Sequence, residues 1–129
     1  MLRSRLWSSR TKASNASELT DAVFVDVVFD AGLLYLELVN LCGAPALDVT
    51  SSFEPALVDA HGRDVSELLL FRGLGFLAPG RRIRTLLGPS SAYSESVVVE
   101  VQYSGAGRER HTTRVTHELA AFRELAYVV

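Results

Sequence analysis

Alternation of apolar and polar residues is the main pattern of this chain. It is clearest over residues 33–53, where two alternating segments are joined by a short connection that contains glycine and proline. In the first segment, Leu34, Leu36 and Leu38 share one face. A period of two with one apolar face is typical of a half-buried antiparallel β-strand.

The same alternation recurs along most of the chain and predicts six strands. Their predicted ranges are Val23–Phe29, Leu33–Asn40, Ala46–Phe53, Arg82–Leu87, Ser96–Tyr103 and His111–Leu119. Asp30-Ala31-Gly32 separates the first two strands, and glycine adopts positive φ without steric cost. These two strands are therefore predicted to form a β-hairpin.

The middle of the chain is less regular. Residues 65–71 fit either a strand or one and a half helical turns, and we favour a short strand or irregular segment. Leu74, Phe76 and Leu77 lie between glycines, and we expect all three to fill the core.

Six or seven short strands with turn signals every 8 to 12 residues or so predict an antiparallel sandwich or barrel. We expect an all-β, antiparallel, immunoglobulin-like β-sandwich of about seven strands; a small closed barrel is the alternative. The expected organisation is a flexible basic and polar tail over residues 1–20, the sandwich over 21–119, and a C-terminal extension over 120–129. The composition of this extension also fits a short helix.

The composition limits the number of domains, the kind of partner and the location of this protein. The chain has 129 residues, 48% of them hydrophobic, which is enough for one domain with its own core. A net charge of −2 makes nucleic acid an unlikely partner. Cys42 is the single cysteine, so no internal disulfide can form, and a reducing, cytoplasmic location is expected.

No part of the sequence approaches the roughly 18 to 20 continuous apolar residues of a membrane span. The N-terminal segment has four basic residues and no apolar region after them, so it does not fit a secretory signal. We expect a solvated tail. Contact of this tail with an acidic partner or an anionic membrane is the alternative.

Three short motifs resemble those of small bacterial immunoglobulin-like domains of uncharacterised function. Asn40, Gly43 and Ala46 carry the first, a turn between two strands. Pro79-Gly80 carries the second, before a strand, and Tyr103 ends the valine-rich strand that carries the third. The resemblance covers about Ala22 to Glu118. It implies an interaction module and transfers no active site.

Residues for catalysis, cofactors or metal binding do not assemble into a recognisable pattern. His111 and His117 share a strand face, but six residues at about 3.3 Å rise place them roughly 20 Å apart. Cys42 has no neighbouring histidine or cation in the sequence to lower its pKa. We therefore predict no catalytic, cofactor-binding or metal-binding residues.

The predicted function is a non-enzymatic protein–protein interaction or assembly module that acts through a sheet edge or the end loops. The alternative is a small-ligand binder with an internal pocket lined by Phe24, Tyr35 or Tyr103. Two arginine groups on strands favour solubility and protection of sheet edges, because charged edge strands discourage unwanted pairing. The alternative is that, if their strands were close, they would form one cationic docking face for an acidic protein segment. The six candidate residues are Arg81, Arg82, Arg84, Arg108, Arg110 and Arg114.

The apolar C-terminal residues have two interpretations. We expect them to pack across an open end of the sandwich, because a domain of this size needs the buried area. Homodimerisation through them, or through a sheet edge, is the alternative.

Overall fold

The computed structural model describes residues 21–125, and seven strands form within that range. The strands are β1 (Val23–Asp30), β2 (Leu33–Asn40), β3 (Ala46–Glu54), β4 (Leu74–Leu77), β5 (Arg82–Pro89), β6 (Ser96–Ser104) and β7 (Arg110–Glu118). Four short helical segments accompany them: η1 (Val65–Glu67), α2 (Leu69–Arg72), η2 (Ser90–Ala92) and α3 (Ala120–Leu125). The expected tail over 1–20, and residues 126–129 of the expected extension, lie outside the described residues.

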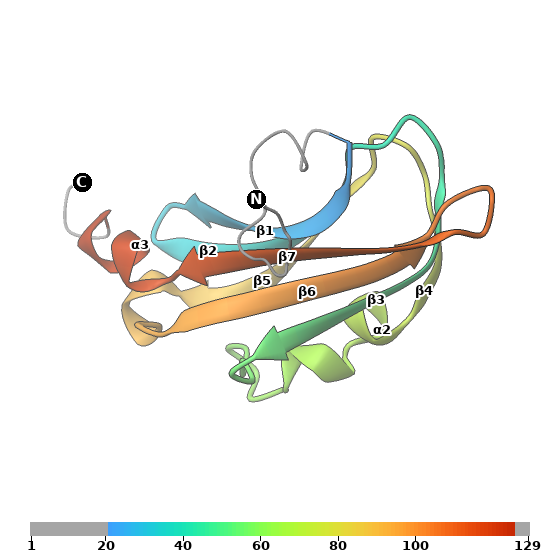
Figure 1. The fold of residues 1–129 in the computed structure, drawn as a ribbon. Coiled ribbons are helices and arrows are strands. Elements are labelled where there is room, and N and C mark those ends of the chain that lie inside the picture. Colours follow the sequence, from blue (N-terminus) through green and yellow to red (C-terminus); the bar gives the residue numbers. More distant parts are fainter. Residues whose placement is uncertain (1–20, 126–129) are drawn as a thin grey trace, which may run out of the picture.

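The strands form two packed antiparallel sheets (Figure 1). Sheet A has the order β1-β2-β5, and sheet B has the order β4-β3-β6-β7. This is the Greek-key arrangement of immunoglobulin-like sandwiches, with the fourth strand paired to the third instead of the fifth. The predicted all-β sandwich is confirmed. The barrel alternative is wrong, because the strands divide between two separate sheets.

The first hairpin follows from local sequence. β1 and β2 pair in register from Val23 opposite Asn40 to Asp30 opposite Leu33. The two residues between the strands, Ala31 and Gly32, have φ values of 52° and 82°. Positive φ at both central positions is the geometry of a tight hairpin turn whose twist matches the strands.

The core lies between the sheets and is built from every second residue of their strands. Sheet A contributes Val23, Val25, Val27, Leu34, Leu36, Leu38 and Leu87, and sheet B contributes Val49, Phe53, Val97, Val99, Val101 and Tyr103. The alternation predicted from the sequence is therefore confirmed on both sides of the core.

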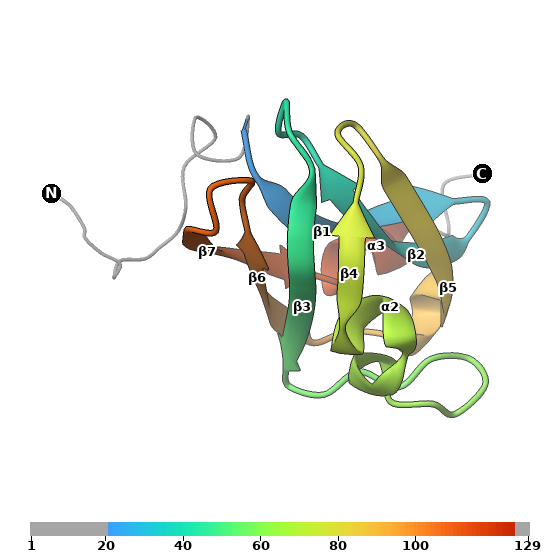
Figure 2. The same ribbon diagram turned by 90° about the vertical axis from the view of Figure 1, so that its right-hand side faces the viewer.

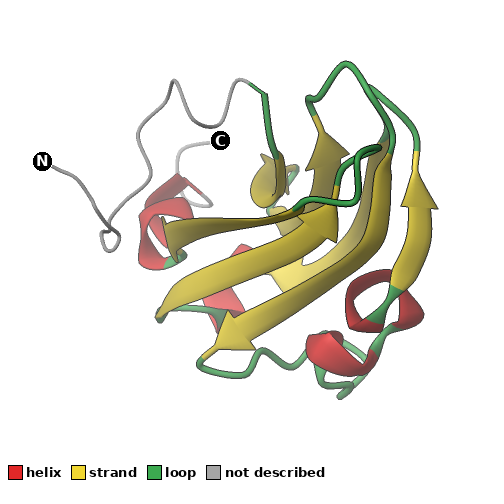
Figure 3. Cartoon of the chain, turned by 45° about the vertical axis from the view of Figure 1, so that its right-hand side comes forward, coloured by secondary structure: helices red, strands yellow, loops and turns green. Residues whose placement is uncertain are grey.

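The segment between β3 and β5 differs from the prediction. Residues 65–71 form η1 and the start of α2, so the favoured short strand is wrong. The helical turns bring the Phe71 ring into edge-on contact with Phe53, 5.1 Å between centroids, and bury it completely. Figure 3 shows the short helices at the margins of the strands, and α2 packs against β3 and β4.

β4 follows α2 and was not expected as a strand. Leu77 is buried as predicted, but Phe76 is 58% exposed, so its assignment to the core is wrong. Phe76 pairs in register with Leu47 of β3, beside a bulge at Asp48, whose φ is 50°. A bulge changes which face the following residues occupy, and the sequence pattern gives no sign of it.

Asn40 joins the two sheets at one end of the sandwich. Its side chain is fully buried, and its Nδ2 donates to the carbonyl oxygens of Leu77 at 3.0 Å, Ala44 at 3.1 Å and Ala78 at 3.3 Å. Its Oδ1 accepts from the Cys42 N–H at 2.7 Å. The side chain therefore fixes both the β2–β3 and the β4–β5 connections.

Tyr93 has a similar role at the opposite end. Its hydroxyl donates toward the carbonyl oxygens of Val58 at 2.7 Å and Leu87 at 3.0 Å. A tyrosine at the corner before the sixth strand, bonded to upstream backbone, is a recurrent feature of immunoglobulin-like sandwiches. Gly88 is required beneath it, because its φ is 155° and an added Cβ would lie 2.9 Å from the tyrosine oxygen.

The C-terminal extension begins with a short helix, as its composition allowed. α3 places Phe122 against Phe29 of β1 with ring centroids 6.1 Å apart, after the buried Leu119. The described part of the extension therefore packs on the sandwich.

Candidate functional site

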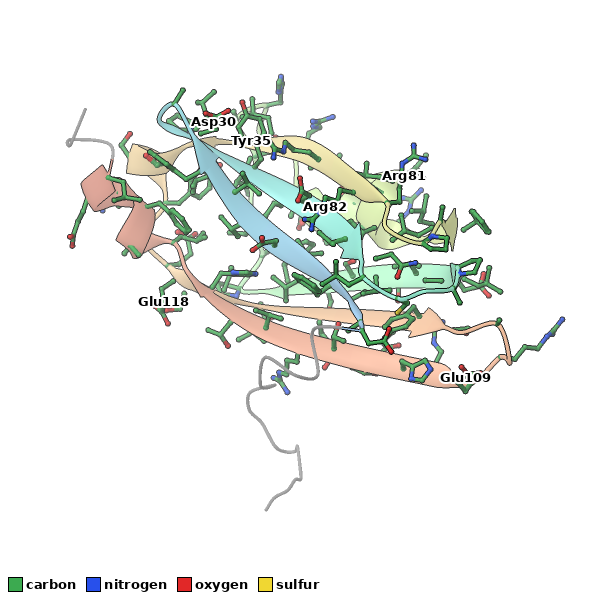
Figure 4. All side chains as sticks on the ribbon, turned by 90° about the horizontal axis from the view of Figure 1, so that it is seen from above. Asp30, Tyr35, Arg81, Arg82, Glu109 and Glu118 are labelled. Carbon is green, nitrogen blue, oxygen red and sulfur yellow. The ribbon has the colours of Figure 1, made fainter. Side chains whose placement is uncertain are left out.

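The most unusual surface of the described chain is the outer face of sheet A, which we call the A face. Figure 4 looks onto this face and labels Tyr35 and Arg82 on it. The register of β1, β2 and β5 arranges its side chains in three cross-strand rows. These rows are Phe24–Val39–Arg82, Asp26–Glu37–Arg84 and Val28–Tyr35–Leu86. Two largely apolar rows thus flank one charged row.

The outer face of sheet B is more polar along β3, β6 and β7. Its corresponding rows are Glu54–Val98–Thr116, Ser52–Glu100–Arg114 and Thr50–Gln102–Thr112. Valine is the single apolar residue in these nine positions, whereas the A face has five in nine. A solvated antiparallel sheet face is normally polar, and the A face departs from that expectation across all three of its strands. Sheet B departs from it at the β4 edge, where Phe76 is 58% exposed beside Leu47.

Glu37 organises the charged part of the A face. Its side chain is only 9% exposed, and its two carboxylate oxygens bind different arginines of β5. Arg82 donates through a terminal nitrogen at 3.0 Å, and Arg84 contacts the other oxygen at 3.2 and 3.3 Å. Both guanidinium groups are therefore held in place by one carboxylate.

Arg84 is held from a second side. Its guanidinium carbon lies 5.1 Å from the centroid of the Tyr35 ring, within the range of a cation–π contact. The side chains of Arg82 and Arg84 nevertheless remain 54% and 43% exposed. They are ordered within the chain and still accessible to a partner.

The six candidate arginines do not form one cationic face. β5 is an edge strand of sheet A and β7 is an edge strand of sheet B, and Figure 2 shows β7 and β5 at opposite sides of the molecule. The expected juxtaposition of the two groups is therefore wrong. Arg81, Arg82 and Arg84 lie at or before β5, and Arg108, Arg110 and Arg114 lie in or before β7.

The second arginine group is spread over the β6–β7 hairpin. Arg108 occupies the turn with a φ of 68°. Arg110 donates to the Asp48 carbonyl at 2.9 Å and to the Ser104 hydroxyl at 3.1 Å. Arg114 lies on the outer face of β7, in register with Glu100. Arg110 thus serves contacts within sheet B.

Cys42 lies at one end of the sandwich, next to Tyr103. Burial and the nearby Asp21 carboxylate raise the pKa of the Cys42 thiol, and a hydrogen bond with Tyr103 only partly offsets them. Burial is also the main cause of the raised pKa of Tyr103, whose ring stacks on His111 at 5.2 Å. A thiol with a raised pKa is the reverse of an activated nucleophile.

The histidines of β7 have separate environments. His111 lies 3.3 Å from the Glu109 carboxylate, whereas a ring nitrogen of His117 lies 2.8 Å from the Val25 carbonyl oxygen. Thr113 also donates to a β1 carbonyl, that of Val23. Side chains of β7 thereby occupy backbone acceptors on the free edge of β1, which reduces the access of another strand to that edge.

Residues 21–125 contain neither a cluster of metal ligands nor a membrane-spanning helix. No group of three or more histidine, cysteine, aspartate or glutamate side chains in this range could hold a metal ion. No helix in the same part of the chain is long and apolar enough to cross a membrane. Phe24 and Tyr35, proposed from the sequence to line an internal pocket, lie on the A face instead, whereas Tyr103 lies in the core.

The sequence identified Arg82 and Arg84 as candidate binding residues, but it gave no role to Glu37. Phe24 and Tyr35 were assigned to an internal pocket instead of this surface. The signal was present in part, because β1 and β2 carry apolar residues on both faces. Strands that are covered on both faces have this composition. The pairing of Glu37 with two arginines depends on a register between β2 and β5, whose first residues, Leu33 and Arg82, are 49 positions apart.

The comparisons with known proteins identify a family and no activity. No curated protein and no solved structure matches the chain. A family model described as "Domain of unknown function (DUF8453)" matches residues 5–123, which include all seven strands. The chain therefore belongs to the DUF8453 family.

Proposed function

We propose that this domain is a non-enzymatic protein-interaction and assembly module that binds its partner through the A face. The observation that carries the proposal is the composition of the A face: five of the nine residues in its cross-strand rows are apolar, against one of nine on β3, β6 and β7 of sheet B. Val39 is fully buried among them, and the other four are half-buried. The resemblance to small bacterial immunoglobulin-like domains supports the same role, since it implies an interaction module.

The residue types of the A face support protein recognition. Tyrosine and arginine are enriched among the residues that dominate binding energy at protein interfaces. Tyr35 and Arg84 contact each other, and Arg82 is fixed through Glu37. Because these side chains are ordered before binding, they lose less conformational entropy when a partner engages them.

Charge supports a partner that presents a carboxylate among apolar groups. Two guanidinium groups share the single Glu37 carboxylate, so the β5 side of the A face carries excess positive charge. A carboxylate from the partner can accept hydrogen bonds from both guanidiniums, and such charge-assisted bonds are strong and directional.

The test compares the two arginine groups. The domain is immobilised and used to capture proteins from its source cell, and each captured protein is identified, purified and titrated by calorimetry against four forms of the domain. These forms are the wild type, Arg82→Glu/Arg84→Glu, Arg108→Glu/Arg110→Glu and Arg123→Glu, the last an exposed arginine of α3 as a control. Folding of each variant is checked by thermal unfolding.

We expect the Arg82→Glu/Arg84→Glu variant to bind the purified partner at least about tenfold more weakly, because two ordered cations become anions beside Glu37. The other two variants should bind like the wild type. Equal affinity of all forms would refute the A face as the binding surface. Loss of binding in Arg108→Glu/Arg110→Glu alone would assign the interaction to the β6–β7 hairpin instead.

A further inference from the structure

The charges of the A face are arranged asymmetrically across its three strands. Asp26 and Asp30 lie on β1, and Arg82 and Arg84 lie on β5 at the opposite side of the sheet. β2 separates them, so at about 4.8 Å per strand the acidic and basic sides are roughly 10 Å apart. One sheet face therefore has an acidic side, a basic side and apolar residues around them.

We propose that the partner of the A face is a second copy of this chain, packed sheet to sheet about a two-fold axis parallel to β2. This inference rests on the proposed function and names its partner. Rotation about such an axis places β1 of one copy over β5 of the other and preserves the order of the cross-strand rows. The interface is isologous, so each contact occurs twice.

The charged row is complementary to itself in this arrangement. Asp26 of one copy faces Arg84 of the other, because both belong to the same row. Each Glu37 near the axis faces its counterpart, and each is already held between two guanidinium groups of its own chain. Asp26 from the second copy supplies the additional carboxylate that the two arginines lack. In each copy the two negative charges of Asp26 and Glu37 then balance the two positive charges of Arg82 and Arg84.

The flanking rows are also complementary. In the row Val28–Tyr35–Leu86, valine faces leucine and the tyrosines meet near the axis. In the row Phe24–Val39–Arg82, the phenylalanine ring of one copy faces the Arg82 guanidinium of the other, an arrangement in which a cation is attracted to an aromatic face.

The size of the A face fits a weak interface. Three strands at about 4.8 Å spacing and eight residues at about 3.3 Å rise cover roughly 380 Å² in projection. Two copies together therefore bury roughly 760 Å², less than the roughly 1,000 Å² of a stable specific interface, since Val39 and Glu37 are already buried within the chain. We therefore expect a dimer that dissociates on dilution.

The test is a charge exchange followed by analytical ultracentrifugation of the full chain over a concentration series. In an Asp26→Arg dimer, the new arginine of each copy faces Arg84 of the other copy. In an Arg84→Asp dimer, the new aspartate of each copy faces Asp26 of the other copy. Each single variant should raise the dimer dissociation constant at least about tenfold. An equimolar mixture of the two variants should recover the dimer as a heterodimer, because every altered charge then meets its opposite.

The matched control is Glu54→Arg, the same type of charge reversal on the outer face of sheet B, which should leave the dimer unchanged. Recovery in the mixture also shows that both single variants are folded, so a loss of dimer cannot be mistaken for unfolding. If either variant fails to unfold cooperatively on heating, Phe24→Glu replaces it and is expected to weaken the dimer as well.

Three results would overturn the inference: a monomeric wild type at about 1 mM, a dimer that both A-face variants preserve, or a mixture that stays monomeric. The first and third results reject a second copy of the chain as the partner, but they leave the proposed function open to its own test. That test is the binding of a purified heterologous partner to the Arg82→Glu/Arg84→Glu variant. A preserved dimer in both variants assigns dimerisation to another surface, such as a sheet edge or the C-terminal segment.

Discussion

Substitution of Asn40 by aspartate tests whether one buried amide holds the two sheets together at their loop end. The change is isosteric and keeps the oxygen that accepts from the Cys42 N–H. It replaces the amide nitrogen, which donates to three carbonyl oxygens at 3.0–3.3 Å, with an oxygen that cannot donate when ionised. The Ala44 carbonyl lies in the β2–β3 connection, the Leu77 carbonyl at the end of β4, and the Ala78 carbonyl in the β4–β5 connection.

The magnitude follows from the number of protons lost. An amide nitrogen carries two protons, so about two full hydrogen bonds disappear, each with a net contribution of about 1 kcal/mol. The new carboxylate oxygen then faces carbonyl oxygens in a fully buried position, which costs about 1–3 kcal/mol more. We expect Asn40→Asp to lower the free energy of unfolding by about 3–5 kcal/mol, a large part of the roughly 5–15 kcal/mol of a typical domain.

Acid should partly reverse this loss. Burial raises the pKa of the introduced carboxyl above its unfolded value near 3.9, so the folded variant binds a proton before the unfolded chain does. The free energy of unfolding of the variant therefore rises, relative to the wild type, as pH falls from the folded pKa toward the unfolded one. A protonated carboxyl can donate again to one of the carbonyls.

Urea unfolding followed by circular dichroism at several pH values measures both effects. Gln102→Glu provides the control, because it makes the same amide-to-acid change at an exposed position of β6. The control should change the free energy of unfolding by less than about 0.5 kcal/mol. An Asn40→Asp variant within about 1 kcal/mol of the wild type at pH 7 would refute the role given to this side chain.

Two other changes test the opposite end of the sandwich. Tyr93→Phe removes the hydroxyl that bonds the Val58 and Leu87 carbonyls, and should lower the free energy of unfolding in urea by about 1–3 kcal/mol; an unchanged midpoint would contradict this role. Asp59 is buried, which acts to raise its pKa, but hydrogen bonds from the following turn outweigh burial and lower the pKa. Its contribution to stability is therefore present above the unfolded pKa near 3.9 and is lost as pH falls through the folded pKa. Asp59→Asn should cost about 1 kcal/mol at pH 7 and little at pH 2.

Much of the fold could be predicted from the sequence because its signals are local. A period of two identified β1, β2, β3, β5, β6 and β7, since burial of one sheet face selects every second residue. The hairpin turn at Ala31-Gly32 was also visible, because its positive φ values depend on neighbouring residues alone. These predictions needed no knowledge of which strands pair.

The errors concern residues whose environment depends on distant parts of the chain. Residues 65–71 fit two secondary structures locally, and the place for Phe71 beside Phe53 selects the helical one. Phe76 is a large apolar residue of the kind usually found in a core. It is exposed because β4 lies at the edge of sheet B, beside a bulge. The hydrophobic side chain of a residue makes its burial favourable. Whether the fold offers a buried position for that side chain depends on how distant parts of the chain pack.

The candidate surface divides in the same way. The sequence by itself determined that arginines occur on the strands that became β5 and β7, and that β1 and β2 are apolar on both faces. The tertiary structure alone decided that β5 and β7 lie at opposite sides of the sandwich and that Glu37 binds two of the arginines. Strand pairing brings residues together across more than forty positions of chain, and the alternation that predicts a strand is the same for every neighbour the strand could have.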